Sequence, residues 1–264
     1  MSEVTSQDGT KIAYDRYGDG PPVILVGGAF QFRAFDPSTA QLAQLLGERF
    51  GAIHYDRRGR GESGDTKPYS TDREVEDIEA LVDAAGGTAS LFGMSSGAVL
   101  ALDAAARLPA AKVAKVAVYE APFIVDNLRP PLPEGYHDKL VELVEAGRPG
   151  DAVEHFLVHG AAVPPEFVSQ MRGAPMWPGF ESVAHTLVYD SALMGDGSVS
   201  ADRWAGVRVP VLVSDGGASG PVMHNAAKAL AGVLADARER TLEGQGHDVA
   251  PDVLAPVLEE FFAG

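Results

Sequence analysis

Hydrophobic residues along the chain form two kinds of pattern that follow one another. Short, continuous apolar runs are typical of strands buried on both faces. These runs are residues 23–26, 52–55, 89–92, 113–119 and 210–213, and we expect a further strand at residues 238–242. Between them, apolar residues recur every three or four positions, which is typical of helices with one buried face. The helical stretches are residues 37–49, 72–85, 98–108, 221–234 and 253–262. Strands that alternate with helices predict an α/β fold, built on a doubly wound and mostly parallel sheet.

Two segments depart from this alternation. Residues 4–17 alternate weakly around Asp8-Gly9-Thr10, a turn sequence that predicts an antiparallel hairpin. Residues 122–207 contain helical patches separated by proline-rich turns, and no run typical of a strand. These patches are residues 137–146, 151–159 and 180–189. The sequence therefore predicts a core formed by residues 1–121 and 208–264, with a helical cap inserted at residues 122–207.

Composition and charge narrow the classes of partner. The 264 residues are 45% hydrophobic and 22% charged, which is ordinary for a globular protein. The formal net charge of -16 argues against nucleic acid or an anionic membrane as a partner. One short basic cluster, Arg57-Arg58-Gly59-Arg60, is too small to change this, and we interpret it as a glycine-rich loop after a strand.

The chain has no cysteine, which excludes disulfides, a thiolate nucleophile and cysteine-based metal sites. Its first residues lack the charged-then-apolar pattern of a secretory signal. No apolar run approaches the length needed to span a bilayer. We therefore expect a cytoplasmic protein that binds no membrane.

The sequence Gly93-Met94-Ser95-Ser96-Gly97 lies between a predicted strand and a predicted helix. Strand, Gly-x-Ser-x-Gly and helix, in this order, form the layout of a nucleophile elbow. The residues two positions before and after the serine crowd each other on such a sharp turn, so both must be glycine or nearly so. The helix behind the serine directs N–H groups and the positive end of its dipole at any oxyanion formed there. This favours Ser95 as a nucleophile over an accidental Gly-Ser turn.

Four blocks of sequence resemble the α/β-hydrolase family and together cover essentially the whole chain. They match the family's oxyanion turn, the loop after the next strand, the elbow and the catalytic histidine loop. The blocks are residues 26–30, 55–63, 93–97 and 244–248. The resemblance implies the α/β-hydrolase fold with an inserted cap, and it says much less about the substrate.

The resemblance also implies the roles of two residues. His247 follows Gly246 after the last predicted strand and comes after Ser95 in the chain, as the family's order requires. His247 would take the proton from Ser95 and later return it to the leaving group. A surface histidine without a catalytic role is the structural alternative.

The carboxylate partner of His247 departs from the family's pattern. The family usually places an aspartate three residues after a glycine that follows the penultimate strand, and here that position is Ser219. Glu120 ends the strand after the elbow helix, where some members, including certain haloalkane dehalogenases, carry their acid. Asp215 lies closer to the usual position but precedes the glycine. We expect Glu120 to be the acid and keep Asp215 as the alternative, and neither residue as a third possibility.

The oxyanion turn departs from the pattern as well, because Gly27 stands where the family usually has histidine. The donors are backbone N–H groups, so little is lost chemically. By match to the motif, the oxyanion hole would consist of the amides of Ala29 and Ser96. A serine nucleophile at position 95, rather than aspartate, argues against dehalogenase chemistry.

Bulky apolar residues of the cap and of the oxyanion turn are candidates for a substrate pocket. Most should pack the cap on the sheet, and a minority should line an apolar cleft. The candidates are Phe30, Phe123, Met176 and Trp177. His155 and His159 lie four residues apart on a predicted helix, but no third metal ligand accompanies them, and we expect no metal and no cofactor.

These observations predict a serine hydrolase that cleaves an ester or lactone of an uncharged, hydrophobic small molecule through an acyl-enzyme on Ser95. The unusual Ser219 keeps a second class open, namely a non-hydrolytic protein of the same fold. It would be a ligand-binding module, a cofactor-independent lyase or a cyclising acyltransferase of secondary metabolism. The substrate's identity, its acyl chain length and the oligomeric state are not encoded in any motif that we recognise.

Overall fold

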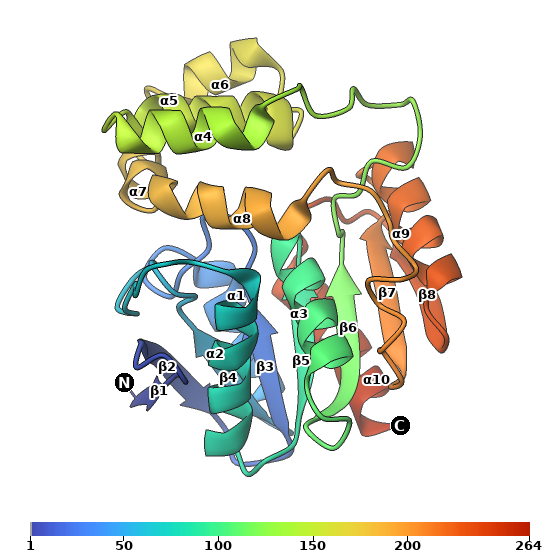
Figure 1. Cartoon of the computed structure of the whole chain (residues 1–264). Coiled ribbons are helices and arrows are strands. Elements are labelled where there is room, and N and C mark those ends of the chain that lie inside the picture. The colour runs from blue at the N-terminus through green and yellow to red at the C-terminus, as the bar shows by residue number, and fades with distance from the viewer. Residues whose placement is uncertain (1) are drawn as a thin grey trace.

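A twisted eight-stranded sheet forms the centre of the protein (Figure 1). The computed structural model describes residues 2–264, so that Met1, the first residue of the predicted core, lies outside the described residues. The strands are β1 (Ser2–Thr5), β2 (Lys11–Tyr17), β3 (Pro22–Val26), β4 (Gly51–Tyr55), β5 (Ala89–Met94), β6 (Val113–Tyr119), β7 (Val211–Gly216) and β8 (Ala237–Leu242). Their order in the sheet is β1-β2-β4-β3-β5-β6-β7-β8.

The strand directions confirm the predicted fold class. β1 and β2 form the predicted antiparallel hairpin, and β2 pairs antiparallel with β4. Every other neighbouring pair is parallel. The hairpin turn is stabilised by the backbone amide of Thr10, which donates to the Asp8 carboxylate over 2.9 Å.

Helices cover both faces of the sheet, as the alternation of strands and helices predicts. One face carries α2 (Thr71–Ala84), α3 (Ser96–Arg107) and α9 (Pro221–Val233), and the other carries α1 (Pro37–Leu46) and α10 (Pro251–Ala263). Neighbouring residues of one strand point to opposite faces. In β3, Ile24 and Val26 pack with the first group of helices, whereas Val23 and Leu25 pack with the second. Both faces are therefore buried, which explains why the strand sequences are continuous apolar runs.

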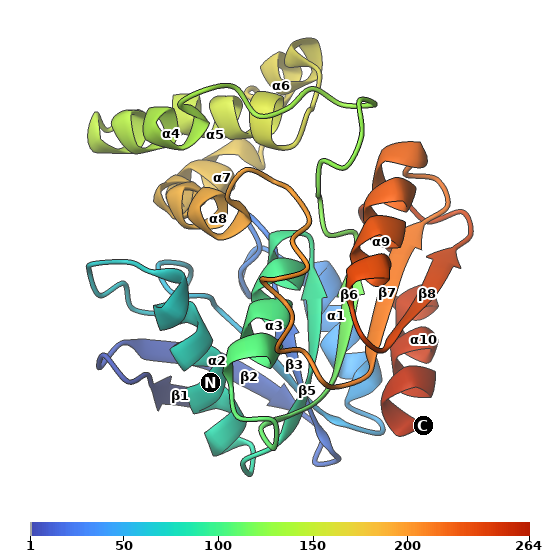
Figure 2. The ribbon, with the colours of Figure 1, turned by 45° about the vertical axis from the view of Figure 1, so that its right-hand side comes forward.

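The segment between β6 and β7 forms a helical layer over the carboxyl ends of the parallel strands (Figures 1 and 2). It comprises α4 (Tyr136–Glu145), α5 (Pro149–His155), a π-helical turn (Phe156–Gly160), α6 (Pro165–Met171), α7 (Trp177–Ser182), a 3-10 turn (Ala184–Thr186) and α8 (Leu187–Met194). The sequence predicts no helix at α6, because Val163-Pro164-Pro165 belongs to the proline-rich sequences that are typical of turns. Proline is well tolerated at the first position of a helix, and Pro165 begins α6 in this way.

The layer has a hydrophobic core of its own, to which Leu140, Val153 and Leu187 contribute buried side chains. The last residues of the segment pack on the main core instead of on the cap. Trp204 is buried with the helices of the main core, where its ring lies 5.3 Å from that of Phe123. Residues 122–207 contain no strand, but their final stretch packs on the core rather than on the cap.

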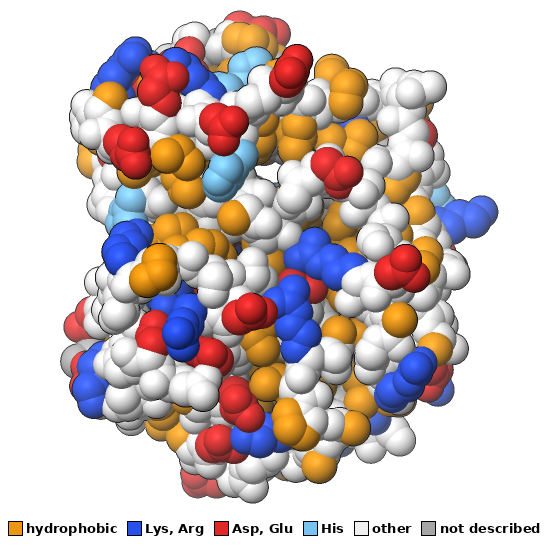
Figure 3. Space-filling view, viewed as in Figure 1, with side chains coloured by type: hydrophobic (Ala, Val, Ile, Leu, Met, Phe, Trp, Pro, Cys, Tyr) orange, Lys and Arg blue, Asp and Glu red, His pale blue; other side chains and the backbone are white. Residues whose placement is uncertain are grey.

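Within residues 2–264, no helix is both long and apolar enough to cross a membrane. The face seen in Figure 3 carries acidic and basic side chains interspersed with one another.

Candidate active site

Ser95 occupies a strained turn between β5 and α3. Its backbone angles are φ 55° and ψ -125°, in the left-handed region that residues with a side chain rarely adopt. The two flanking glycines are required by close packing, because a Cβ atom on Gly93 would overlap the carbonyl oxygen of Gly97. A Cβ on Gly97 would in turn overlap the carbonyl oxygen of Val26. The geometry is that of the predicted elbow, and it presents Ser95 at the carboxyl edge of the sheet.

Two backbone N–H groups beside Ser95 are free to bind an anion. Ser96 is the first residue of α3, so its amide has no partner inside the helix. Among residues 2–264, neither the Ser96 amide nor the Ala29 amide donates a hydrogen bond. The turn that carries Ala29 lies against the elbow, since a Cβ on Gly28 would be only 2.9 Å from Cβ of Ser95. These two amides are suited to stabilising an oxyanion on a carbonyl attacked by Ser95.

Buried side chains fix the conformation of this turn. The Gly28 amide donates to Oε1 of Gln31 over 2.5 Å. The carbonyl oxygens of Gly27 and Gly28 accept hydrogen bonds from the guanidinium groups of Arg57 and Arg60, respectively. Because the carbonyl oxygens are held in this way, the turn needs no histidine at position 27 to keep its shape.

Both arginines pair with one carboxylate from the cap. Asp190, in α8, is fully buried and lies 2.8 Å from Arg57 and 2.6 Å from Arg60. It also accepts a 2.7 Å hydrogen bond from the hydroxyl of Ser96. Burial alone would raise the pKa of Asp190, but the attraction of Arg60 and Arg57 and the Ser96 hydrogen bond hold it below its usual range. Asp190 therefore connects the cap to the elbow and, through the arginines, to the oxyanion turn.

Residues 57–60 form the predicted loop after β4, but the three arginines in it are buried. Arg57, Arg58 and Arg60 are each about 1–2% exposed and are paired with buried carboxylates. Arg57, for example, makes two 2.7 Å hydrogen bonds to Glu74 in α2. No local sequence pattern predicts these ion pairs, because the partners lie in distant segments of the chain.

Glu120 and His247 are joined by a hydrogen bond of 2.7 Å between Oε2 and Nδ1. The Glu120 side chain is fully buried, and its other oxygen accepts a 2.9 Å hydrogen bond from the amide of Gly216. Burial alone would raise the pKa of Glu120. The hydrogen bonds from His247 and Gly216, together with the nearby Ser219 hydroxyl, outweigh burial and keep this pKa below its usual value. Glu120 is therefore ionised and is suited to stabilising a positive charge on the imidazole.

Ser219 lies beside this pair, in the position where the family usually carries its acid. Its hydroxyl is buried and forms no hydrogen bond of good geometry among residues 2–264, although it lies close enough to favour the charged form of Glu120. Glu120 itself has a φ of 48°, in the left-handed region. The carboxylate thus reaches the histidine from the neighbouring strand, β6, instead of from the loop after β7.

The imidazole of His247 is 45% exposed, so that water reaches it. Since Glu120 binds Nδ1, the other nitrogen, Nε2, is left for Ser95. Within residues 2–264, Ser95 Oγ forms no hydrogen bond, and contacts of this kind often tighten only when a substrate is present.

Asp215, the alternative acid, is engaged elsewhere. Its carboxylate accepts a 2.8 Å hydrogen bond from the Thr241 hydroxyl and lies 3.2 Å from Nδ1 of His224. It makes no hydrogen bond to His247 in the part of the chain that the structure describes. Of the two candidate acids, the fold brings only Glu120 to His247.

A small cavity opens at Ser95 beneath the cap. It has a volume of about 50 Å³, and Ser96, Arg129, Tyr136 and Phe156 are among the residues that line it. The apolar side chains predicted for the pocket lie elsewhere. Trp177 and Phe123 are buried in the cap core and in the main core, and Met176 is 46% exposed on the surface. Phe30 packs on Phe156, with 5.4 Å between the ring centroids, and does not itself line the cavity. The predicted side chains do not line the cavity because an inserted helical layer needs its large apolar side chains for its own core.

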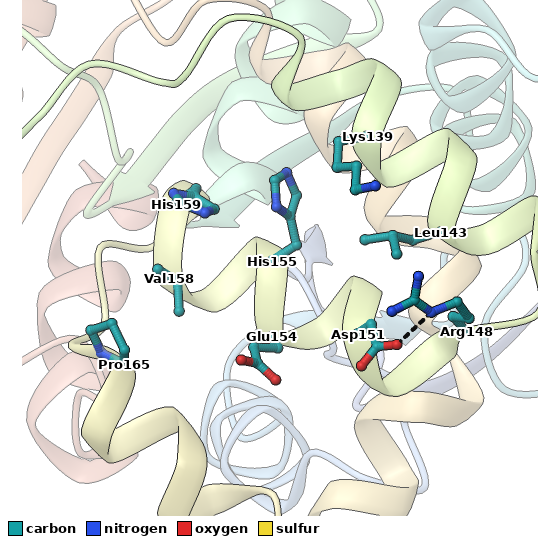
Figure 4. A pocket seen from close by; sticks show the side chains of 9 residues that line it. All are labelled: Lys139, Leu143, Arg148, Asp151, Glu154, His155, Val158, His159 and Pro165. Carbon is teal, nitrogen blue, oxygen red and sulfur yellow. Dashed lines mark hydrogen bonds and ion pairs between the residues drawn. The ribbon is translucent and has the colours of Figure 1, made fainter.

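A larger groove, of about 420 Å³, lies on the outer side of the cap (Figure 4). Lys139, Asp151, Glu154, His155 and His159 are among the residues that line it, whereas Ser95 and His247 are not. The rings of His155 and His159 are 4.7 Å apart. Among residues 2–264, no group of three or more His, Asp or Glu side chains is arranged to hold a metal ion. The groove is separate from the elbow, and we assign the candidate active site to the cavity at Ser95.

Comparison with known proteins identifies the family of this chain. A model described as the alpha/beta hydrolase family matches residues 23–258. The crystal structure of an alpha/beta hydrolase from Sphaerobacter thermophilus is 53% identical over 99% of this chain and 100% of that chain, with a TM-score of 0.91. The enol-lactonase from Burkholderia xenovorans has a TM-score of 0.73 at 20% identity, over 100% of both chains, which is a likeness of fold.

A curated relative, the proline iminopeptidase PfmaB from Pestalotiopsis fici, is 32% identical over 90 residues. The match covers 31% of this chain and 29% of that protein, so less than a third of the relative is represented.

Proposed function

Because the chain belongs to the α/β hydrolase family, we propose that it is a serine hydrolase that cleaves a carboxylic ester or lactone of a small molecule. The observation that carries the proposal is the 2.7 Å hydrogen bond between the buried Glu120 carboxylate and His247. Such a contact orients the imidazole and stabilises its protonated form. The strained Ser95 and the two free amides beside it support the same proposal, because acyl transfer through a serine uses groups of these kinds.

Acylation begins when Nε2 of His247 takes the proton of the Ser95 hydroxyl. Oγ of Ser95 attacks the carbonyl carbon, and the carbonyl oxygen becomes an oxyanion that accepts hydrogen bonds from the amides of Ala29 and Ser96. The intermediate then collapses, the bond between the carbonyl carbon and the alcohol oxygen breaks, and His247 gives its proton to the leaving alcohol. Glu120 stays ionised throughout and balances the charge of the imidazolium.

Deacylation repeats these steps with water as the nucleophile. His247 takes one proton from water, the resulting hydroxide equivalent attacks the acyl carbon, and the proton returns to Ser95 as the acid product leaves. The 45% exposure of the His247 side chain supports this step, because bulk water reaches the base. The same exposure disfavours a cyclising acyltransferase, which must keep water away from its acyl-enzyme.

The buried position of Asp190 supports the same mechanism indirectly. Asp190 forms ion pairs with Arg57 and Arg60, and these arginines donate hydrogen bonds to the carbonyl oxygens of the oxyanion turn. Fixing these carbonyls keeps the neighbouring amides directed toward the reacting oxygen before the substrate arrives. Preorganised donors of this kind are usually the largest contribution to catalysis of acyl transfer.

A fluorophosphonate probe tests the proposal, since it labels an activated serine irreversibly. We expect stoichiometric labelling of the wild-type protein on Ser95, and none in Ser95→Ala. The wild-type protein should also hydrolyse 4-nitrophenyl butyrate with uptake of one water per turnover. A folded wild-type protein that is neither labelled nor active on this ester contradicts the proposal, and a product formed without net addition of water favours cyclisation.

A further inference from the structure

Arg129 is a buried cation that is not neutralised by the protein. It lies in the loop between β6 and α4, and only 7% of it is exposed. Its single hydrogen bond in the described chain runs from Nη2 to the carbonyl oxygen of Gly160, over 2.8 Å. Its Nε is buried without a partner, and no carboxylate among residues 2–264 lies within ion-pair distance of it. Guanidinium groups remain charged in proteins, so this site carries an uncompensated positive charge.

Arg129 and Ser95 both line the cavity beneath the cap. The other charged residue on the wall is Asp190, and Arg57 and Arg60 already neutralise it. Arg57 is in turn balanced by Glu74. Among the charged residues that line the cavity, Arg129 is therefore the one that no ion pair within residues 2–264 balances, although the chain as a whole carries -16.

Tyr136 adds a second donor to the same wall. Burial raises the pKa of its phenol, so that the hydroxyl keeps its proton. The residue is 7% exposed, and its hydroxyl makes no hydrogen bond among residues 2–264. The phenol lies against Gly160, where a Cβ atom would overlap the hydroxyl oxygen. Gly160 thus accepts from Arg129 and leaves room for Tyr136, which brings the two donors to one end of the cavity.

The cavity is on the acyl side of the reaction, if the proposed function holds. His247 gives a proton to the leaving alcohol, so the alcohol must depart next to the half-exposed imidazole. The cavity is lined by Ser95 but not by His247, and the cap covers it. At about 50 Å³, it has room for roughly three or four water-sized groups. A short acyl chain with a small polar end fits this volume.

We infer that Arg129 and Tyr136 form a carboxylate-binding subsite, and that the substrate is an ester or lactone whose short acyl group ends in a carboxylate. This inference rests on the proposed function and makes its substrate class more specific. Apolar side chains such as Ile124 and Leu132 also line the cavity and suit the methylene groups of the acyl chain, whereas Arg129 suits a carboxylate at its end. The inference therefore departs from the sequence-based expectation of an uncharged substrate. A carboxylate would pair with Arg129 and satisfy the donor that the protein leaves unpaired.

Matched ester pairs test the subsite on the wild-type protein. Monoethyl succinate carries a terminal carboxylate, and ethyl succinamate replaces it with an amide of nearly the same shape. Ethanol release measures kcat/KM for each ester. We expect the wild type to prefer the charged ester roughly ten- to hundredfold, the range for a hydrogen bond to a charged group.

Substitutions at Arg129 assign the preference to this residue. Arg129→Met should abolish the preference, and Arg129→Lys should keep part of it, because lysine retains the charge but not the fork of donors. Arg148→Met is the matched control, since Arg148 is a half-exposed arginine of the cap surface that lines the outer groove. It removes the same charge and should leave the preference unchanged.

The outcomes separate the subsite from the hydrolase proposal. Labelling of Ser95 by fluorophosphonate without any preference for monoethyl succinate overturns the subsite and leaves the hydrolase intact. Absence of labelling in a folded protein overturns the hydrolase itself. If Arg129→Met does not fold, the wild type and Arg129→Lys still decide. Equal rates on the two esters in the wild type contradict the inference, and so does a preference in Arg129→Lys that is as large as that of the wild type.

Discussion

The Glu120 carboxylate lies 2.7 Å from Nδ1 of His247, although the two residues are 127 positions apart in the chain. Glu120 follows β6, and His247 lies in the loop between β8 and α10. The parallel arrangement of β6, β7 and β8 brings both loops to the same edge of the sheet. At the position between them that the family usually gives to the acid, the chain has Ser219, and the carboxylate comes instead from one strand further away.

The elbow predicts a strict requirement for glycine at position 97. Gly97→Ala would place a Cβ atom against backbone oxygen that cannot move without disrupting β3. We expect a loss of stability of about 1–3 kcal/mol, the usual cost of overpacking, and loss of fluorophosphonate labelling. Urea denaturation measures the former.

Gly232→Ala is the matched control for this substitution. Gly232 lies in α9 with open space where a Cβ would be added. The change should stabilise the protein by about 0.5–1 kcal/mol, because alanine favours a helix. Similar stabilities for the two variants would contradict the steric account of the elbow.

Asp190 should be far more important for stability than its position in the cap implies. Asp190→Asn leaves Arg57 and Arg60 buried with too little negative charge. Breaking a buried pair in this way costs about 3–5 kcal/mol. The variant should also lose esterase activity, because the arginines no longer hold the oxyanion turn.

Asp138→Asn makes the same chemical change on the exposed face of α4 and serves as its control. It should alter the free energy of unfolding by less than about 0.5 kcal/mol. An Asp190→Asn protein as stable and as active as this control would show that the buried network is dispensable.

The depressed pKa values of Asp190 and Glu120 predict how stability changes with pH. In the unfolded chain these carboxyls take up protons near their usual values of 3.8 and 4.5, whereas the folded protein takes them up only at lower pH. Their contribution is therefore complete above pH 5 or so and is lost as the pH falls through the lower, folded-state values.

Urea denaturation at several pH values between 3 and 7 measures this dependence. The free energy of unfolding of Asp190→Asn should fall less steeply below pH 4 than that of the wild type, because one of the two groups no longer titrates. Parallel curves for the two proteins would contradict the assignment of this pH dependence to Asp190.

Local sequence signals were sufficient for the fold and for the elbow. The strained conformation of Ser95 requires glycine on both sides, so the requirement is written within five consecutive residues. The inner strands β3 to β7 are buried on both faces, and their continuous apolar runs make them easy to recognise. The proximity of Glu120 to His247 followed from the strand order that the family resemblance implied.

Features that depend on packing between distant segments were not predictable. Asp190 and Arg129 resemble ordinary surface residues in the sequence, and only the packing of the cap buries them. The pocket side chains were mispredicted for the converse reason, because hydrophobic residues such as Trp177 carry no sign of which layer will bury them. Sequence patterns of this kind report that a residue is buried, but not which neighbours it meets.

The most direct test of the account is the rate constant for acylation of Ser95 in Glu120→Gln, measured with 4-nitrophenyl butyrate under single-turnover conditions. Glutamine keeps the shape of the side chain but cannot balance the imidazolium charge, so we expect a loss on the order of 10⁴-fold, as for the amide variant of a triad acid. Asp215→Asn removes a carboxylate that pairs with Thr241 and His224, and it should stay within about tenfold of the wild type. A Glu120→Gln protein that is folded and acylates at the wild-type rate, or a larger loss in Asp215→Asn, would contradict the role assigned to Glu120.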